Sequence, residues 1–342
     1  MKTPLVSVIL TAFKHSQYLD AAIRSVLAQT MTDFELVVTD DADSKTTRRS
    51  CHRFWQDRRV RYRANSQRLG ALMNIASALR EVRGEFVTIL NDDDQMEPDM
   101  LEALLPPLMK NANCVLSVGD RWMVDSVDRP LPELTLATSR MRGLQSIGKG
   151  FVPAPFDLAL RGGVLIGMGA VFRRQALRKE WLVPQAQGAY DFWLGVQLCC
   201  AEGSVHFLPR RLMRYRVHDI SESARPDPEK IQGEIFIFES LLKHPMTMTN
   251  HVYVKKQLAA SLFILGRGRL YFKNPRRARQ AFVRSLRVHC RLKPLIGFGL
   301  TFLPDFVQRF GIWFLRMTRD IPHRIARTVR ACKAQQTEYG PA

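Results

Sequence analysis

The sequence predicts an α/β protein that begins with an open, mostly parallel sheet and ends with an α-helical extension. Over about the first 118 residues, short apolar runs typical of buried parallel strands alternate with segments of helical periodicity, and the loops between them are short. Helical patterns alone follow from about residue 226. The alternation indicates strands joined by right-handed helical crossovers.

The first strand–helix units occupy residues 5–62. Leu5–Leu10 is apolar at nearly every position, as expected of a central strand covered on both faces. Ser16 is a candidate N-cap for a helix whose apolar residues recur at helical spacing. A second strand is expected at Phe34–Thr39, then a polar helix to about Trp55 and a short strand at Val60–Tyr62.

The same alternation continues to residue 118. A helix is expected at Gly70–Val82, a strand at Phe86–Leu90, a helix at Asp99–Met109 and a strand at Val115–Val118. In a sheet of this kind, ligands bind outside the carboxyl ends of the strands. The residues that follow each strand are therefore the first candidates for a functional site.

Carboxylates follow two of these strands. Asp40 and Asp41 end the second strand, and Asn91-Asp92-Asp93-Asp94 follows Phe86–Leu90. Topology should bring both groups next to Thr11–Phe13, which follows the first strand. Three adjacent carboxylates repel one another, and a hard divalent cation with oxygen ligands relieves that repulsion. A solvated acidic turn is the ordinary structural alternative.

The first strand is not followed by a phosphate-binding loop. Neither Gly-x-Gly-x-x-Gly nor Gly-x4-Gly-Lys-Ser/Thr occurs there. A metal ion held by carboxylates is the other standard way to neutralise a diphosphate. The acidic edge therefore predicts a site for a nucleoside diphosphate with Mg²⁺ or Mn²⁺.

Three segments, in this order and spacing, resemble the family 2 glycosyltransferases. They are Val6–Phe13 with the helix Tyr18–Gln29, then Asp33–Asp41, then Gly84–Asp94 followed by Pro98. Together they cover about residues 4–118, and weaker matches extend to about residue 220. The resemblance implies the GT-A (nucleotide-diphospho-sugar transferase) fold with its Rossmann-like sheet, and an inverting transfer from a sugar nucleotide.

The resemblance also implies roles for individual residues on the donor side. The nucleotide would bind against the segment Thr11, Ala12 and Phe13, with Asp41 at the edge of the base. Arg68 stands where the family often has a basic contact to base or phosphate.

The aspartate triplet would hold the ribose, metal and diphosphate. Asp92 would reach the ribose or the metal, and Asp93 and Asp94 would handle the metal and the diphosphate. Family members commonly have Asp where this chain has Asn91, and Asp40–Asp43 replaces their usual Asp-Asp-Gly-Ser turn. The first departure leaves the division of roles among the three aspartates open.

The region after residue 118 is expected to bind the acceptor. Residues 120–160 lack clear periodicity and are rich in Pro, Gly and Arg, as in a lid or an acceptor-binding loop. Gly162–Phe172 is strand-like and punctuated by glycines, which would let a substrate approach the backbone or would simply mark bends in a packed strand.

Asp191 is the candidate general base. It stands at the start of a helix that runs through Leu198. An aspartate at the start of a helix is ordinarily an N-cap. The resemblance implies that this acid takes the proton from the acceptor hydroxyl as the hydroxyl attacks the anomeric carbon. Tyr190 precedes it at a position where members typically have an acid or an aromatic residue.

His218 is the candidate imidazole ligand of the metal. Strands are expected at Val205–Leu208 and Leu212–Val217, and His218 closes the second. Similar family members place a histidine here near the metal or the diphosphate, whereas a lone histidine is otherwise an ordinary structural or exposed residue.

The net charge of +19 is concentrated in the C-terminal part. From Lys255 onward there are 19 Lys/Arg residues against three acids, whereas the rest holds 32 against 29. Helices are expected at Ile231–Lys243, Val252–Tyr271, Pro275–Cys290 and Pro294–Met317. The basic and apolar faces fit either a helix in the interface of an anionic membrane or a helical cap on the catalytic domain. Nucleic acid is not expected, because no nucleic-acid motif accompanies the charge.

The six cysteines show no metal-ligand spacing and indicate free thiols in a reducing compartment. No secretory signal and no apolar run of about 18 residues is found. A cytoplasmic location is therefore expected, with peripheral attachment to the inner face of the membrane as an option.

Together these observations predict a metal-dependent inverting glycosyltransferase with Mn²⁺ or Mg²⁺. Its donor is a nucleoside-diphosphate sugar, with UDP favoured, and its acceptor a hydroxyl such as that of a lipid-linked glycan in polysaccharide or glycolipid synthesis. Residues 1–225 form the catalytic domain (1–118 for the nucleotide sugar, 119–225 for the acceptor) and 226–342 the basic helical module.

Two alternatives stay open. One is a nucleotidyltransferase that makes the sugar nucleotide, although Thr11–Lys14 is not the Gly-rich, basic loop it would need. The other is a non-catalytic membrane- or nucleic-acid-binding protein on a degenerate GT-A domain, against which the intact acidic edge and Asp191 argue.

Overall fold

The computed structural model describes residues 3–13, 17–218 and 228–304, together with residues 307 and 311. The chain forms two compact units. Unit 1 comprises Met1–Pro184 and Tyr190–Asp219, and unit 2 comprises Gln185–Ala189 and Ile220–Ala342. The expected boundary between residues 225 and 226 lies outside the described residues, so the predicted domain limits, including the division at residue 118, stay predictions.

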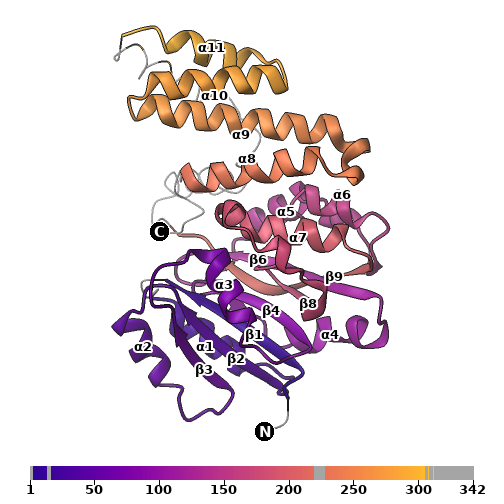
Figure 1. The fold of residues 1–342 in the computed structure, drawn as a ribbon. Coiled ribbons are helices and arrows are strands. Elements are labelled where there is room, and N and C mark those ends of the chain that lie inside the picture. The colour runs from indigo at the N-terminus through magenta and orange to yellow at the C-terminus, as the bar shows by residue number, and fades with distance from the viewer. Residues whose placement is uncertain (1–2, 14–16, 219–227, 305–306, 308–310, 312–342) are drawn as a thin grey trace, which may run out of the picture. The chain divides into compact units, whose positions relative to one another are not determined.

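Unit 1 is built on a mixed, mostly parallel sheet (Figure 1). The order is β3-β2-β1-β4-β8-β6-β9-β5, and β7 also pairs with β9. All neighbours from β3 to β4 are parallel, as are β6 and β9, whereas β8 is antiparallel to both β4 and β6. The strands are β1 (Val6–Ala12), β2 (Phe34–Asp40), β3 (Val60–Ala64), β4 (Phe86–Asn91), β5 (Gln95–Met96), β6 (Cys114–Val124), β7 (Gly150–Phe151), β8 (Ala170–Arg173) and β9 (Ser204–Arg216).

The central strands form where the sequence is continuously apolar. Every residue of β2 is buried, and so is nearly every residue of β1 and β4, because helices and loops cover both faces. The parallel register pairs Ala12 with Asp40 and Thr11 with Asn91. The carboxyl ends of β1, β2 and β4 therefore meet at one edge, as predicted.

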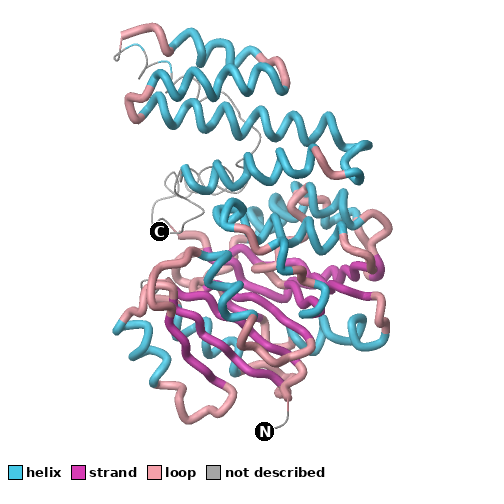
Figure 2. Tube along the Cα trace, in the orientation of Figure 1, coloured by secondary structure: helices cyan, strands magenta, loops and turns pink. Residues whose placement is uncertain are grey.

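Figure 2 shows the strands of unit 1 gathered in one layer, with helices against it. Helix α3 packs on β1 and β2, and α4 packs on β6 and β8. The helices are α1 (Leu19–Leu27), α2 (Lys45–His52), α3 (Ala71–Leu79), α4 (Met100–Lys110), α5 (Pro132–Met141), α6 (Pro155–Leu160) and α7 (Tyr190–Cys200). The expected N-cap Ser16 lies outside the described residues, and Tyr18 occupies the N-cap position of α1.

The expectation of a long irregular loop over residues 120–160 is wrong. β6 continues to Val124, and α5 and α6 follow, each with a proline in its first turn. The sequence pattern missed β6 because polar residues interrupt it at Asp120 and Arg121, where the pairing with β9 also shifts register.

Two further strand predictions need correction. In Gly162–Phe172, residues 164–169 form no strand, and pairing begins only at Ala170. The two strands expected at Val205–Leu208 and Leu212–Val217 are one continuous strand, β9, because β6 accommodates the break through its register shifts.

Unit 2 is helical. Its helices are α8 (Pro228–Leu242), α9 (His251–Tyr271), α10 (Pro275–Val288) and α11 (Leu292–Leu300). α9 packs against each of the other three. The fully buried Phe282 of α10 lies so close to Gly266 of α9 and Gly297 of α11 that a Cβ at either glycine would come within 2.7 Å of its ring. The predicted C-terminal helical extension is thus confirmed.

The last helix is shorter than expected. The apolar helix predicted at Pro294–Met317 starts at Leu292 and stops at Leu300, and most of residues 305–317 lie outside the described residues. Among the described residues, no helix is long and apolar enough to cross a membrane.

Candidate active site

The ends of β1 and β4 are tied together by side chains. The hydroxyl of Thr11 donates to Oδ1 of Asn91 at 3.3 Å, and the backbone N–H of Phe13 donates to Oδ2 of Asp92 at 3.3 Å. The segment expected to contact the nucleotide therefore lies directly against the start of the acidic turn.

Asp41 organises the loop that leads into α3. The backbone N–H of Asp41 donates to the carbonyl of Ala12 at 2.9 Å, which holds Asp41 beside the end of β1. Its carboxylate is 3% exposed and accepts bonds from the N–H groups of Leu69 (2.8 Å) and Gly70 (2.7 Å) and from Nδ2 of Asn65 (2.9 Å). Gly70 has φ +83°, a conformation that favours glycine.

Arg68 belongs to this loop and meets Phe13. Its guanidinium lies 4.6 Å from the centroid of the Phe13 ring, within the range of a cation–π contact. Arg68 is exposed, Phe13 and Thr11 are partly exposed, and Ala12 is 1% exposed. Ala12 is consequently buried and offers little surface to a ligand, whereas the Phe13–Arg68 pair offers a flat, cationic surface.

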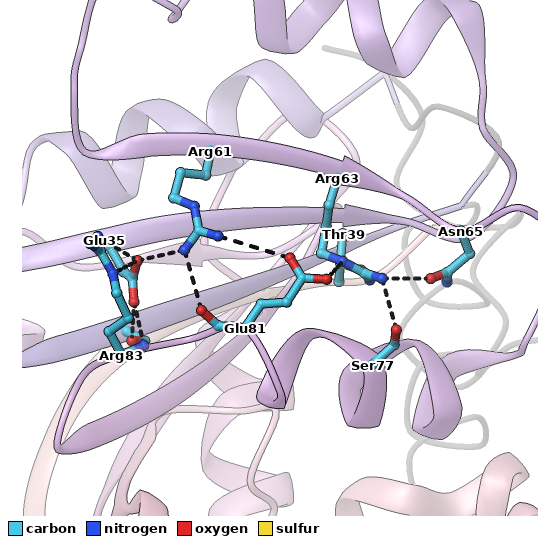
Figure 3. A network of polar contacts seen from close by, with 9 residues as sticks. Glu35, Thr39, Arg61, Arg63, Asn65, Ser77, Glu81 and Arg83 are labelled. Carbon is cyan, nitrogen blue, oxygen red and sulfur yellow. Dashed lines mark hydrogen bonds and ion pairs between the residues drawn. The ribbon is translucent and has the colours of Figure 1, made fainter.

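A polar network behind this loop holds Asn65 in place (Figure 3). Nη2 of Arg63 donates to Oδ1 of Asn65 at 3.0 Å and to Oγ of Ser77 at 2.7 Å. Glu81 pairs with Nε of Arg63 at 2.9 Å. Because Asn65 in turn donates to Asp41, β3 and α3 together fix the position of the Asp41 carboxylate.

The network continues to a buried acid, Glu35, whose side chain is 3% exposed. Burial alone would raise the pKa of Glu35. Bonds from the backbone N–H of Arg83 and from the side chains of Ser7, Arg61 and Arg83 outweigh burial and lower that pKa below its usual value. Glu35 is therefore an ionised structural residue at the base of β2 rather than a member of the site.

Asp93 and His218 are in direct contact. Oδ2 of Asp93 and Nε2 of His218 are 3.0 Å apart, although 125 positions separate them in the chain. His218 follows the end of β9, and its ring lies 5.2 Å from that of Tyr18. The pair is thus formed where β9 returns to the acidic turn.

Unlike Asp93, Asp94 is buried and has both carboxylate oxygens bonded within the chain. It is 1% exposed, and its two oxygens accept bonds from the backbone N–H of Arg216 (3.0 Å) and from Nδ2 of Asn91 (3.2 Å). Burial, and then the charge of Asp93, raise the pKa of Asp94 well above its usual value. Asp94 therefore joins β9 to the acidic turn.

The Asp93–His218 pair offers two donors of the kinds that bind divalent cations. Within the described ranges, no three His, Cys, Asp or Glu side chains come together as a complete metal site. One carboxylate oxygen and one imidazole nitrogen are nevertheless donors suited to Mn²⁺. Ions of this kind commonly complete their coordination with phosphate oxygens and water.

Helix α7 begins next to the acidic turn. The hydroxyl of Tyr190 donates to Oδ1 of Asn91 at 2.9 Å, and Asp191 follows Tyr190 in the first turn. Asp191 is partly exposed, and its Oδ1 accepts the backbone N–H of Phe192 at 2.8 Å. Gly167 lies close by: a Cβ there would be 3.3 Å from the Tyr190 hydroxyl and 4.0 Å from Cβ of Asp191. Asn91 and Asp191 hence lie close together.

Sequence reasoning missed Arg216. Its backbone binds Asp94, its Nε donates to the carbonyl of Asp93 at 3.0 Å, and its guanidinium lies 4.4 Å from the centroid of the Tyr18 ring. An arginine near the end of an expected strand, two residues before the candidate ligand His218, is the sequence signal that could have found it.

The arrangement of sheet and helices is the GT-A fold of nucleotide-diphospho-sugar transferases. One similar structure is S. aureus TarS 1–349 in complex with UDP-GlcNAc, with a TM-score of 0.57 and 14% identity over 95% of this chain and 91% of that one. Another is the mannosyltransferase PcManGT from Pyrobaculum calidifontis in complex with GDP-Man and Mn²⁺, with a TM-score of 0.57 and 15% identity over 96% and 87% of the two chains. At these identities the likeness establishes the fold alone, and it confirms the predicted fold.

The chain belongs to glycosyl transferase family 2. The model of that family matches residues 7–181, about half of the chain, and includes the three segments that predicted it. The family prediction is therefore confirmed.

Curated relatives match about a third of the chain. The chondroitin synthase of Escherichia coli is 32% identical over 122 residues, which cover 34% of this chain and 18% of the relative. The UDP-Glc:alpha-D-GlcNAc-diphosphoundecaprenol beta-1,3-glucosyltransferase WfgD of Escherichia coli is 34% identical over 107 residues, covering 31% and 42%. Each match spans less than half of the relative's own length.

Proposed function

We propose that this protein is an inverting, metal-dependent glycosyltransferase that moves a sugar from a nucleoside-diphosphate sugar to a hydroxyl acceptor. The observation that carries the proposal is the double contact at Asn91. Its Oδ1 accepts hydrogen bonds both from Thr11, on the expected nucleotide side, and from Tyr190, next to the expected base Asp191.

The nucleotide would occupy the edge formed by β1, β2 and the loop before α3. The Phe13–Arg68 pair would contact the base or the phosphates, and Asp41, already bonded to that loop, would accept from the edge of the base. Uracil offers such an N–H donor. A relative is named for a UDP-glucose donor, and TarS was solved with UDP-GlcNAc, so UDP is the favoured nucleotide.

Asp93 and His218 would hold Mn²⁺ or Mg²⁺ together with the diphosphate, with Asp92 beside them. Such an ion supplies positive charge where the leaving diphosphate becomes negative. Asp94 has both oxygens in bonds to the chain, and we propose that it supports the metal pair by fixing Asp93 and the end of β9 rather than by direct ligation.

Asp191 would act as the general base. As the acceptor oxygen forms its bond to the anomeric carbon, the Asp191 carboxylate takes the proton of the acceptor hydroxyl. The bond from that carbon to the diphosphate oxygen breaks, its electron pair stays on the diphosphate, and the configuration is inverted.

The acceptor would be the hydroxyl of a lipid-linked glycan in polysaccharide or glycolipid synthesis. Relatives named for diphosphoundecaprenol-linked substrates support this class. Such a substrate lies at a membrane, where a peripheral enzyme has to reach it.

Unit 2 carries a surface suited to an anionic membrane. On α11 and the residues after it, Leu292, Leu295, Ile296, Phe302 and Leu303 are exposed at helical spacing. Residues 251–304 hold 12 Lys/Arg and no Asp or Glu. Of these basic residues, Arg284 pairs with Glu239 of α8. An apolar stripe in such a basic stretch is complementary to anionic headgroups over an apolar interior.

The proposal is tested by incubating the purified protein with UDP-glucose, UDP-N-acetylglucosamine or GDP-mannose, with and without Mn²⁺. We expect UDP with Mn²⁺ to raise the melting temperature and at least one donor to release its nucleoside diphosphate slowly. A protein that responds to no nucleoside diphosphate would contradict the proposal. Incubation with UTP and a sugar 1-phosphate tests the nucleotidyltransferase alternative, because that enzyme alone would release pyrophosphate.

A further inference from the structure

Arg121 is a buried cation with unused hydrogen-bond donors. It lies in β6 and is 3% exposed. Its Nη1 reaches the carbonyl of Met168 only at 3.5 Å, and within the described part of the chain Nε and Nη2 are buried without a hydrogen-bond partner. Burial lowers the pKa of Arg121, and the negative groups Asp120, Asp191 and Asp94 oppose that effect.

An arrangement of this kind needs an explanation. A guanidinium has five N–H donors, and buried polar groups are nearly always bonded. Removing such a charge from water is costly unless its donors are satisfied. The nearby carboxylates offset only part of the cost of burying Arg121, and they leave its donors unpaired, so the fold alone does not account for an arginine here.

The position of Arg121 indicates which part of a ligand it would meet. The proposed nucleotide site lies at β2 and β1 and the proposed metal pair at the end of β4, whereas β6 lies beyond β8 on the other side of β4. Arg121 reaches the carbonyl of Met168, and the preceding residue, Gly167, lies against Tyr190 and Asp191 of α7 and against Asn91. Arg121 therefore sits on the α7 side of the diphosphate, where the group transferred toward Asp191 has to be.

We propose that Arg121 binds an oxygen of the glycosyl group of the donor through its Nε and Nη2 donors. The inference rests on the proposed function. A neutral hydroxyl or ring oxygen can accept these bonds, and Asp120, Asp94 and Asp191 already place negative groups near the guanidinium. Arg121 is thus a specificity residue for the sugar.

The segment beside Arg121 contains two glycines, on either side of Met168. Met168, whose carbonyl approaches Nη1, stands between Gly167 and Gly169, and Gly169 has φ +82°. The carbonyl of Gly169 is held by the N–H of Gly119 at 2.9 Å. Met168 itself is held by a bond from its N–H to the carbonyl of Leu165 at 3.1 Å, so a sugar would reach Nε and Nη2 of Arg121 by a movement of this segment between the two glycines while the strand end stays fixed.

The test compares Arg121→Lys with the wild type by calorimetry. Lysine keeps the charge that faces the three carboxylates but lacks the forked pair of donors. The ligands are UDP-glucose, UDP-N-acetylglucosamine and GDP-mannose, with UDP and GDP as references, all with Mn²⁺. For the sugar nucleotide that the wild type binds most tightly, we expect Kd to rise at least about tenfold, and for the matching nucleoside diphosphate less than about threefold.

Arg210→Lys is the matched control, because Arg210 is exposed and pairs with Asp99; it should change neither Kd. The inference would be overturned if the Kd values for the sugar nucleotide and for the nucleoside diphosphate changed equally or not at all. Loss of cooperative melting in Arg121→Lys would also overturn it, because Arg121 would then be structural. Failure of the proposed function is distinguishable: in that case the wild type itself binds no nucleoside diphosphate.

Discussion

The hydroxyl of Tyr190 donates a 2.9 Å hydrogen bond to the side-chain oxygen of Asn91. The two residues are 99 positions apart in the chain and belong to α7 and β4. The first turn of α7 also carries Asp191, so this bond sets the distance between the proposed base and the acidic turn. It explains how asparagine serves at a position where a carboxylate is common: its amide donates to Asp94 while its oxygen accepts from Tyr190.

Replacing Tyr190 with phenylalanine should weaken catalysis more than stability. The variant loses one hydrogen bond, worth about 1 kcal/mol, and with it the link that positions Asp191. We expect kcat to fall roughly fivefold and the melting temperature in the presence of UDP and Mn²⁺ to stay near that of the wild type. Tyr271→Phe, at an exposed position in unit 2, is the control. An unchanged kcat would show that the bond does not position Asp191.

Asp191→Asn should separate donor binding from transfer. The amide keeps the size of the side chain but cannot accept a proton, so the rate of transfer should fall by about 10²–10⁴. The rise in melting temperature with UDP and Mn²⁺ should persist, because the proposed donor contacts lie elsewhere. Asp157→Asn, at an exposed position in α6, controls for the loss of an acid. Turnover near the wild-type rate would remove Asp191 as the base.

His218→Ala should increase the Mn²⁺ requirement. The variant removes one of the two proposed metal ligands, Nε2 of His218, which lies 3.0 Å from Oδ2 of Asp93. We expect the half-saturating Mn²⁺ concentration for hydrolysis of the sugar nucleotide to rise by about 10–100-fold. Asp93→Asn should act in the same direction. The exposed His52 provides the control variant His52→Ala. An unaltered Mn²⁺ titration in both Asp93→Asn and His218→Ala would exclude this pair as the metal site.

Glu35→Gln should destabilise the fold in a pH-dependent way. The ionised carboxylate is buried among two arginines and Ser7, so its loss should cost about 2–3 kcal/mol at neutral pH. Because the folded-state pKa of Glu35 lies below the reference value of 4.5, its contribution is complete above that pH and is lost as the pH falls through the folded-state pKa. Urea unfolding of the two proteins should therefore converge at low pH.

Glu81→Gln is the comparison for that experiment. Glu81 pairs with Arg63 from the same network, but its side chain is 43% exposed, so the change should stay within about 1 kcal/mol. Equal effects of the two substitutions would mean that burial does not set the contribution of Glu35.

Leu295→Glu should weaken attachment to anionic membranes. The substitution puts a negative charge in the middle of the exposed stripe on α11, where Leu295 is 55% exposed. Sedimentation with vesicles that contain phosphatidylglycerol should show loss of binding, and wild-type binding should decrease with salt. Met248→Glu, at an 83% exposed position of the same unit, should matter less. If the wild-type protein does not bind these vesicles, the exposed stripe on α11 does not bind anionic membranes.

Local sequence patterns were sufficient for the strands and helices of residues 5–118 except the two-residue strand β5. There, apolar runs and helical spacing are continuous, and each burial pattern follows from them. The same patterns failed at residues 120–172. Asp120 and Arg121 interrupt the apolar pattern of β6, and the irregular pairing of β6 with the distant strand β9 cannot be inferred from either segment alone. The antiparallel insertion of β8 between β4 and β6 cannot be predicted from local sequence patterns.

By itself, the sequence determined the α/β class, the edge at which Thr11–Phe13, Asp41 and the aspartates would meet, and the order of motifs that identifies the family. Only the tertiary structure decided that Asp93 meets His218 while Asp94 binds the backbone of Arg216, and that Arg121 is buried with unused donors. The reason is physical. Strand periodicity fixes which residues face inward and where a strand ends, whereas the partners of a polar side chain depend on the register of strands far apart in the chain.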